Sequence, residues 1–390
     1  MRILYGYSNC SDSKYHELFH DKSVAVLQAD QKYHGLLIRG LAENGADVEC
    51  VSGLPINRSV TKRLLIREPD EQEGNIRYHY LKTINLPLFR QLGIFFGSLF
   101  FVWKQKKKRQ NVIFCDCLNL ANAFGMLWGS KIKKIPIVYI VTDLPEFQRN
   151  RFLRWVNERM FKRADGFIFL TEQMNQKVNA KGKPYIVLEG HCDCKLGEVS
   201  FDEKYEILTH KKIILYAGSL LKLYGIQNLV EGFLAAGLDD AELHIYGDGD
   251  YRPELEQICE QHKQIRYGGV CPNDKIVYEE QRVALLVNPR PSAPEYTKYS
   301  FPSKNMEYMV SGTPVLTTDL PGMPREYLPY VYLIREESPE GIANDLRQIL
   351  LFSSEERYRK GLDARNFVLN RKSYLIQAKK IIQFLQKELR

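Results

Sequence analysis

Short apolar runs alternate with helix-like segments along the chain. In the first half, six such runs predict strands at residues 3–7, 47–52, 111–117, 137–142, 166–171 and 185–189. Residues 32–45 between two of them follow a helical pattern that ends at Gly45, and glycine is the residue that most often closes a helix. Near-continuous apolar strands separated by helices are typical of a parallel sheet covered on both faces. The pattern therefore predicts an α/β fold.

The alternation restarts after a connector within residues 190–211. Six further strands are predicted at residues 212–219, 242–247, 265–270, 283–288, 314–318 and 330–334. We therefore expect two doubly wound Rossmann-like lobes that face each other across a cleft. The expected boundaries are an N-terminal lobe at 1–194, a linker at 195–211, a C-terminal lobe at 212–370 and a C-terminal helix at 371–390 that packs back on the N-terminal lobe. Open α/β sheets bind ligands beyond the carboxyl ends of their strands.

Charge is distributed unevenly between the halves. The net charge of +8 divides into +10 for residues 1–200 and −2 for residues 201–390. The first half therefore faces an anionic partner, such as nucleic acid, anionic lipid or a phosphorylated substrate. Nucleic acid is not expected, because basic residues are interleaved with aromatic ones only near residues 88–109 and no docking motif appears.

One segment bears on location. Thirteen uncharged residues, QLGIFFGSLFFVW at 91–103, precede KQKKKR at 104–109. They are too few to span a bilayer, which needs about 20. They suit either a helix lying in the interface of an anionic membrane, through residues 88–109, or a core helix with a solvated basic end. The N-terminus is unlike a signal peptide and the eight cysteines form no disulfide framework, so we expect a cytoplasmic protein, peripheral on the inner face of the plasma membrane.

Neither the cysteines nor the histidines predict a metal site. The two Cys-Asp-Cys triplets, at 115–117 and 192–194, place both thiols on one face of a strand, which is typical of buried free cysteine. The usual zinc spacing is absent, and no third ligand accompanies His16 and His20. We expect no metal and no cofactor.

The run YSFPSKNMEYMVSGTPV, which begins at Tyr299, predicts a helix that starts at Ser303. First-turn N–H groups lack intrahelical partners and suit an anion. Lys304 adds a positive charge, and Glu307, one turn along, can accept hydrogen bonds from two ribose hydroxyls. The alternative is a capping box, but that motif places its Glu three residues after the cap, whereas Glu307 is four after Ser303. The run therefore predicts a site for a nucleoside diphosphate.

Three glycine-bearing turns also end predicted strands. They are YAGSLLKLYGI at 216–226, IYGDGD at 245–250 and YGGV at 267–270. Each turn alone is a weak indication that the backbone approaches a phosphate. Several such turns at the ends of strands in one sheet are a stronger indication.

These segments, with NPR at 288–290, come in the order and spacing of the family-four retaining glycosyltransferases of the GT-B fold, which the second half resembles. The run at 299–315 is especially similar to bacterial members that build capsular or exopolysaccharide repeats. The resemblance implies a nucleotide-sugar donor, UDP-sugar above all, transferred with retention and without metal to a glycan or polyprenyl-linked acceptor on the N-terminal lobe. The donor-binding residues that we expect are Gly218, Ser219, Lys222, Gly247, Gly269, Val270, Arg290, Phe301, Pro302, Ser303, Lys304 and Glu307.

The chain departs from the family pattern at three positions. Tyr299 stands where many members have a first glutamate, and Ser219 and Tyr224 stand where many have arginine and lysine. The diphosphate charge is then left to Lys304, Arg290 and Lys222. The departure at Tyr299 keeps two alternatives open, a nucleotide-sugar epimerase and a non-catalytic partner subunit of the same fold.

In the first half, Asp143 ends the predicted strand of IVYIVTDLPEF at 137–147. The family places a polar group here, so Asp143 is our candidate to orient the acceptor or polarise its O–H, and it joins Arg290 and Lys304 as a catalytic candidate. The alternative is a helix N-cap before Pro145. The polar loop at residues 8–20 is a candidate acceptor loop.

Overall fold

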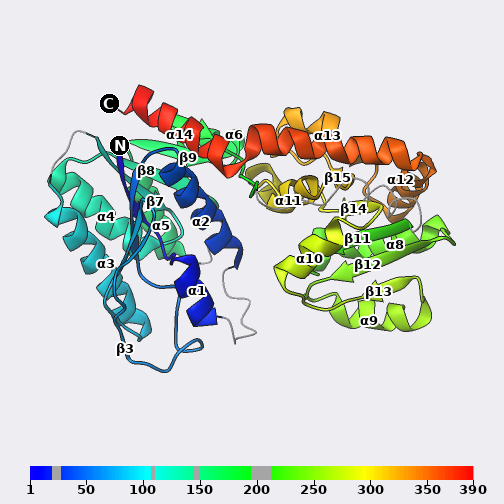
Figure 1. Cartoon of the computed structure of the whole chain (residues 1–390), viewed down its shortest axis with the longest axis horizontal. Coiled ribbons are helices and arrows are strands. Elements are labelled where there is room, and N and C mark those ends of the chain that lie inside the picture. Colours follow the sequence, from blue (N-terminus) through cyan, green and yellow to red (C-terminus); the bar gives the residue numbers. More distant parts are fainter. Residues whose placement is uncertain (20–27, 107–109, 145–149, 195–211, 390) are drawn as a thin grey trace. The chain divides into compact units, whose positions relative to one another are not determined.

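The computed structural model describes residues 1–19, 28–106, 110–144, 150–194 and 212–389 (Figure 1). The chain divides into two compact units, Met1–His191 with Tyr374–Arg390, and Cys192–Ser373. Each unit is an α/β structure built on a largely parallel sheet, so the predicted fold class is confirmed. The expected linker at 195–211 lies outside the described residues.

The first unit is built on an eight-stranded sheet of order β10-β9-β8-β7-β1-β2-β5-β4. Its strands are β1 (Arg2–Gly6), β2 (Asp47–Ser52), β4 (Glu71–Glu73), β5 (Ile76–Tyr80), β7 (Asn111–Asp116), β8 (Ile137–Val141), β9 (Gly166–Phe169) and β10 (Tyr185–Val187), and a separate pair is formed by β3 (Leu65–Ile66) and β6 (Thr83–Ile84). Its helices are α1 (Asp12–Phe19), α2 (Gln28–Glu43), α3 (Pro87–Lys104), α4 (Leu120–Lys133), α5 (Arg151–Phe161), α6 (Glu172–Val178) and α14 (Tyr374–Glu388).

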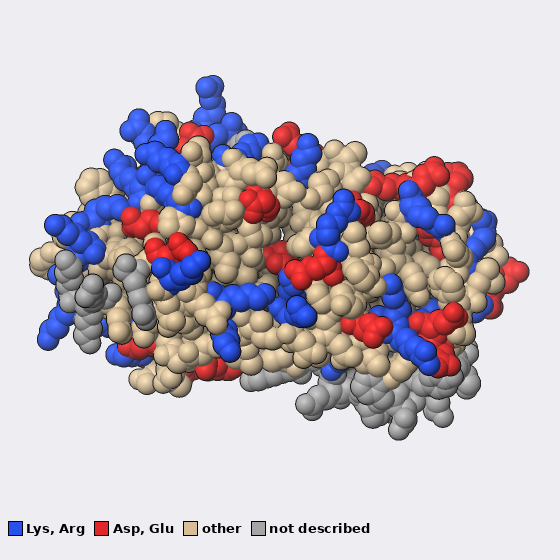
Figure 2. All heavy atoms as spheres, turned by 90° about the horizontal axis from the view of Figure 1, so that it is seen from above, with Lys and Arg blue, Asp and Glu red and all other residues tan. Residues whose placement is uncertain are grey.

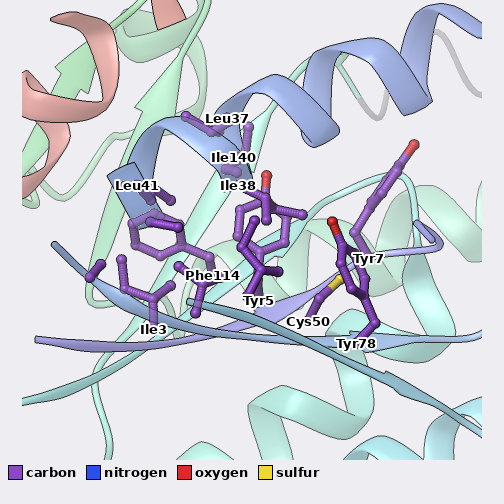
Figure 3. Close-up of a cluster of buried hydrophobic side chains, with 14 of the residues drawn as sticks. Ile3, Tyr5, Tyr7, Leu37, Ile38, Leu41, Cys50, Tyr78, Phe114 and Ile140 are labelled. Atoms are coloured by element: carbon purple, nitrogen blue, oxygen red, sulfur yellow. The ribbon is translucent and has the colours of Figure 1, made fainter. Parts of the chain in front are cut away.

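One face of this sheet is covered by α2 and α14. Figure 3 shows Ile3 and Tyr5 of β1 and Phe114 of β7 directed toward the side chains that α2 contributes, Leu37, Ile38 and Leu41. The last helix lies along α2, where the Tyr374 hydroxyl donates a hydrogen bond of 3.0 Å to Glu43 and a Cβ at Gly40 would press on the Tyr374 carbonyl. The C-terminal helix is therefore part of the first unit's core.

The opposite face of the sheet is covered by α3, α4 and α5. Helices α4 and α5 each connect two neighbouring parallel strands, and α3 leads from β5, by way of β6, back to β7. Right-handed crossovers place such helices on one face of the sheet. A Cβ at Gly125 or Gly129 of α4 would strike atoms of α3, in the segments around Ser98 and Val102. Small residues therefore let these two helices approach closely.

All twelve strands predicted from the pattern occur, but among the described residues four short strands were missed. β4 and β5 form an antiparallel hairpin around Gly74, whose φ is +57°. In β5 the buried residues alternate with more accessible Arg77 and His79, because the strand lies near the sheet edge. Its period of two was a usable signal; β3 and β6, with two residues each, offered none.

The second unit is built on a six-stranded parallel sheet of order β13-β12-β11-β14-β15-β16. Its strands are β11 (Lys212–Ala217), β12 (Ala241–Tyr246), β13 (Ile265–Tyr267), β14 (Leu285–Asn288), β15 (Val315–Thr318) and β16 (Tyr332–Ile334). Its helices are α8 (Ile226–Ala236), α9 (Arg252–Gln261), α10 (Asn273–Glu280), α11 (Ser303–Ser311), α12 (Pro339–Leu351) and α13 (Ser354–Lys372), with short 3-10 turns η2 (Lys222–Tyr224), η3 (Glu295–Tyr299) and η4 (Arg325–Tyr330). Two apolar cores, one on each face, sandwich the sheet.

Glu49 on β2 links stability to pH. Its side chain is buried beside Arg2, whose Nε lies 3.1 Å from the carboxylate, and beside His79 at 3.4 Å. Burial acts to raise the pKa of Glu49, but the bonds from His79 and Arg2 outweigh it and lower the pKa from 4.5 to about 2. The ionised form therefore stabilises the folded state above pH 4.5, and this contribution disappears as the pH falls toward 2.

We expect Glu49→Gln to cost on the order of 3 kcal/mol of unfolding free energy near neutral pH and much less near pH 2. Urea denaturation across that range, with the exposed Glu388→Gln as control, measures the difference. An equal loss at every pH would show that the ion pairs contribute no pH-dependent stability.

Candidate functional site

The helix α11 is tied to the carboxyl ends of three strands of the second unit. At β14, Asn288 donates from its amide to Asn305 at 2.6 Å, and Asn305 donates in turn to Thr317 of β15 at 3.2 Å. At β11, the Tyr308 hydroxyl accepts from the Ala217 N–H at 2.9 Å and donates to the Ala217 carbonyl at 3.2 Å. Burial raises the pKa of Tyr308 well above its ordinary value, so the hydroxyl keeps the proton that it donates. These buried bonds set where the helix begins.

The start of α11 has no side-chain cap from any described residue. Pro302 occupies the N-cap position, and Ser303 is the first helical residue and is exposed. The capping-box alternative is therefore wrong. The Asn305 N–H donates to the Pro302 carbonyl at 2.9 Å, and the first-turn N–H groups of Ser303 and Lys304 have no partner among the described residues. The Lys304 ammonium lies 5.5 Å from the centre of the Tyr308 ring, and its Cε is 3.5 Å from the position that a Cβ on Gly218 would take. The structure thus brings Lys304 to the Gly218 turn.

The three glycine turns pack on one another at the carboxyl ends of β11, β12 and β13. The Gly218 N–H donates to the Tyr246 carbonyl and the Gly247 N–H to the Gly269 carbonyl, both at 2.9 Å. Gly247 has φ +130°, and a Cβ there would collide with the Gly218 carbonyl. The Tyr216 hydroxyl donates to the Ser219 carbonyl at 2.7 Å. Backbone rather than side chains therefore forms the surface next to Lys304.

Arg290, which follows β14, lies between two tyrosine rings. Its guanidinium carbon is 4.7 Å from the Tyr224 ring centre and 4.9 Å from that of Tyr296. Three buried polar atoms, Arg290 Nε, Tyr296 Oη and Ser300 Oγ, lack a hydrogen-bond partner within the described parts of the chain. Such atoms are costly unless a bound molecule or water satisfies them, so this loop is suited to a polar ligand.

Sequence reasoning missed Tyr296 and Ser300. Both belong to the loop between β14 and α11, and their position in that loop was the available signal. Gly225 explains how Tyr224 reaches Arg290: its φ is +76°, and a Cβ there would collide with the Pro289 carbonyl. The missing family lysine is thus replaced at this position by a ring that stacks on arginine.

The remaining predicted residues of this edge differ in their environments. The Lys222 ammonium pairs with Glu254 at 2.5 Å, in an exposed salt bridge. Val270 is 65% exposed at the rim. Phe301 is buried against Tyr327, with ring centres 4.9 Å apart, so its ring supports the loop. Glu307 lies half-buried on α11, one turn beyond Lys304.

Asp143 follows β8 in the first unit and is exposed. Its Oδ1 accepts the Leu144 N–H at 2.8 Å. Partial desolvation raises the pKa of Asp143 above its ordinary value and the Asp116 carboxylate raises it further, while the Leu144 bond opposes both. The N-cap of α5 is Asn150, which accepts from the N–H groups of its first turn. Residues 145–149, which include Pro145 of the alternative interpretation, lie outside the described residues.

A buried polar network adjoins Asp143 and was also missed. Asp116, the last residue of β7, accepts from the Thr142 hydroxyl at 2.9 Å and lies 3.5 Å from His34 Nε2. His34 Nδ1 is 2.6 Å from the Tyr5 hydroxyl. The signal was Asp116 itself, an acidic residue inside an apolar strand.

The cysteines are buried or partly buried thiols. Burial raises the pKa of Cys115 and Cys117 well above the ordinary value, which disfavours the thiolate that a metal would need. Among the described residues, no three His, Cys, Asp or Glu side chains gather into a possible metal site; His20 lies outside them. No described helix has the length and hydropathy required to cross a bilayer.

The sequence of the chain matches two family models. "Glycosyl transferase 4-like domain" matches residues 31–187, and "Glycosyl transferases group 1" matches residues 200–365. The chain belongs to the family-four glycosyltransferases of the GT-B fold. The resemblance drawn from the glycine turns and the α11 run is confirmed at this level.

Solved structures share the fold of this glycosyltransferase over its whole length. Sucrose-phosphate synthase from Thermosynechococcus elongatus is 14% identical, with a TM-score of 0.69 and coverage of 99% of this chain and 98% of that one. HepE of Anabaena, in complex with UDP, is 16% identical, with a TM-score of 0.69 and coverage of 99% and 100%. The lipopolysaccharide outer core galactosyltransferase WaaB is 13% identical, with a TM-score of 0.63 and coverage of 99% of both chains. No curated protein sequence matches the chain.

Gly247→Ala should damage the glycine turns. The new Cβ would collide with the Gly218 carbonyl at an unfavourable φ, so we expect a loss of about 2–4 kcal/mol in unfolding free energy. Gly269→Ala is the matched control, because its φ is also positive, at +69°, but no atom lies within 4 Å of the added Cβ among the described residues; its cost should be about 1 kcal/mol. Chemical denaturation measures both, and equal losses would contradict the close approach.

Proposed function

We propose that the enzyme transfers a sugar from a nucleotide-sugar donor, a UDP-sugar, with retention of configuration and without a metal ion. The acceptor is a glycan or a polyprenyl-linked oligosaccharide of surface polysaccharide synthesis. The observation that carries the proposal is the uncapped start of α11, with Lys304 beside the Gly218 turn. The UDP complex of HepE, a protein of the same fold, supports the choice of donor.

Transfer requires stabilisation of the leaving diphosphate. The bond from the sugar C1 to the phosphate oxygen breaks, that oxygen gains negative charge, and the acceptor oxygen forms a new bond to C1 as it loses its proton. The N–H groups of α11 and the Lys304 ammonium are positioned before that charge develops, which is the most effective form of electrostatic catalysis. In the retaining course, the leaving phosphate oxygen accepts the acceptor's proton on the same face of the sugar.

Arg290 is the second cation in this role. Its stacking between Tyr224 and Tyr296 restricts the side chain, and a fixed guanidinium can offer two parallel N–H groups to phosphate. Its buried Nε lacks a partner among the described residues. Lys222 is already paired with Glu254, so its contribution to the diphosphate requires that exposed pair to open.

Glu307 would hold the ribose hydroxyls, one turn beyond the phosphates. Tyr299 stands in place of the family's first glutamate. This departure keeps two alternative functions of the same fold open, a nucleotide-sugar epimerase and a non-catalytic partner subunit. Release of nucleoside diphosphate only after an acceptor is added supports transfer, whereas conversion of the donor sugar without acceptor supports epimerisation.

The acceptor would bind the first unit. Asp143, in its ionised form, would orient the acceptor and polarise its hydroxyl, with the loop at 8–20 as a further contact. We place the enzyme at the inner face of the plasma membrane, in contact with anionic lipid through residues 88–109, because a polyprenyl-linked acceptor resides in the bilayer.

Lys304→Ala should lower kcat about 100- to 1,000-fold, because one preorganised charge at the leaving group is lost, while stability changes little. Nucleotide release from UDP-sugars in the presence of acceptor measures the rate, and UDP-induced thermal stabilisation measures binding. The control is Lys263→Ala, which removes an exposed lysine just before β13, at the amino ends of the strands and so opposite the candidate site. Wild-type turnover with intact UDP binding would contradict the role of Lys304.

The raised pKa of Asp143 predicts the pH dependence of transfer. Since the ionised carboxylate is the active form, kcat should fall as the pH drops through that pKa, at a higher pH than for an ordinary carboxyl. Asp143→Asn should lower kcat about 100-fold or more and remove this acidic limb. An unchanged acidic limb in the variant would assign the titration to another group.

A further inference from the structure

We propose that the exposed face of α3 and α4 is the surface by which the first unit docks on an anionic lipid membrane. The α3/α4 face is defined by the outward residues Leu92, Phe96, Phe100 and Trp103 of α3 and Trp128 and Ile132 of α4. The inference deepens the membrane location proposed above and rests on it, and it adds a second helix that the sequence did not suggest.

The fold does not need the large apolar side chains that α3 exposes. The buried stripe of this helix consists of Ile94, Ser98 and Val102, and it meets the small residues of α4. The outward stripe consists of Leu92, Phe96, Phe100 and Trp103, which are 44%, 48%, 53% and 51% exposed. Bulky apolar residues thus occupy the solvent side of the helix, which is the reverse of an ordinary surface helix.

The patch continues across to α4. Ring centres lie 5.0 Å apart for Phe95 and Phe96, 5.5 Å for Phe95 and Phe124, and 6.2 Å for Phe124 and Trp128. The aromatic rings therefore form an unbroken path from one helix to the other. Trp128 and Ile132 extend it along α4 with exposures of 52% and 55%. A contiguous exposed patch of this kind marks an interaction site.

Positive charge borders the patch at one end. Helix α3 leads into β7 and helix α4 into β8, and these two strands are parallel, so the C-terminal ends of both helices lie where the strands of the sheet begin. Lys104 and Lys106 follow the aromatic residues of α3, and Lys133 and Lys134 follow Ile132. Lys131, on the other side of Ile132, pairs with Asp165 at 3.5 Å. Residues 86–106 and 117–134 contain no Asp or Glu. Figure 2 shows Lys and Arg gathered on the part of its face that belongs to the first unit.

This combination identifies the occupant as an anionic bilayer surface. Tryptophan and phenylalanine suit the boundary between headgroups and acyl chains, and each lysine near the surface is attracted by anionic headgroups. A second copy of the chain is disfavoured, because two such faces would bring cations of both copies together without an acidic partner from these segments.

Vesicle sedimentation of the full chain tests the proposal. The probes are phosphatidylcholine vesicles with and without about 30 mol % phosphatidylglycerol, at low and at high salt. We expect binding to the anionic vesicles only, weakened by salt. Phe100→Ser with Trp103→Ser, and separately Lys104→Glu with Lys106→Glu and Lys133→Glu, should each weaken binding at least about tenfold.

Matched controls separate this surface from general effects. One control, Lys379→Glu with Lys387→Glu, reverses exposed charges on α14, on the opposite face of the sheet. The other, Leu351→Ser, removes the most exposed large apolar side chain among the described residues, which is 84% exposed. Both control variants should bind vesicles as the wild type does. Circular dichroism and UDP-induced stabilisation report that the variants fold and bind donor, whether or not transfer is later shown. Equal loss in controls and face variants, no vesicle binding by the wild type, or concentration-dependent self-association abolished by Phe100→Ser would each overturn the proposal.

Discussion

The second unit depends on buried hydrogen bonds that hold a nine-residue helix against three strands. Tyr308 binds both backbone groups of Ala217, and Asn305 joins Asn288 to Thr317. These groups are buried, so leaving any of them unpaired would cost about 1–3 kcal/mol. The bonds therefore fix α11 in translation and rotation, and its first turn is held at the edge where the glycine turns end.

That constraint holds the start of α11 in a fixed position beside the glycine turns. Helix α11 brings Lys304 to a surface made of glycine backbone, and Arg290 is held by stacking on two tyrosine rings. A cation held in place before charge develops stabilises that charge without further reorganisation. The departures from the family pattern are compatible with this arrangement, because Tyr224 contributes a ring that positions Arg290 rather than a charge of its own.

The two faces of the first unit's sheet are packed in different ways. The face under α2 and α14 is a conventional core, sealed by large side chains from strands and helices (Figure 3). On the other face, α3 and α4 meet through small residues and leave their large aromatic residues outside. Close helix contact and an apolar outer surface thus arise from the same two helices.

The sequence by itself determined most strands of the two sheets, although several of the predicted ends differ from those in the structure by two or three residues. Long apolar strands, the glycine after α2 and the turns at 218, 247 and 269 are local signals, so the fold class and the edge that carries the candidate residues followed from them. It did not reveal the β4–β5 hairpin, whose alternation is short. Nor did it reveal Tyr296, in the 3-10 turn η3, and Ser300, just after it, whose buried hydroxyls lack partners among the described residues.

Only the tertiary structure decided which side chains at the carboxyl ends of the second unit's strands are already paired within the protein. Lys222 and Lys304 are both lysines just after strand-to-helix turns, yet one pairs with Glu254, 32 positions away in the chain, and the other reaches Gly218. Likewise, the pattern of α3 was compatible with a core helix and with a surface one, and the close approach of α4 settled which stripe is buried. Pairing and burial depend on residues that are distant in the chain, and a local pattern carries no information about those partners.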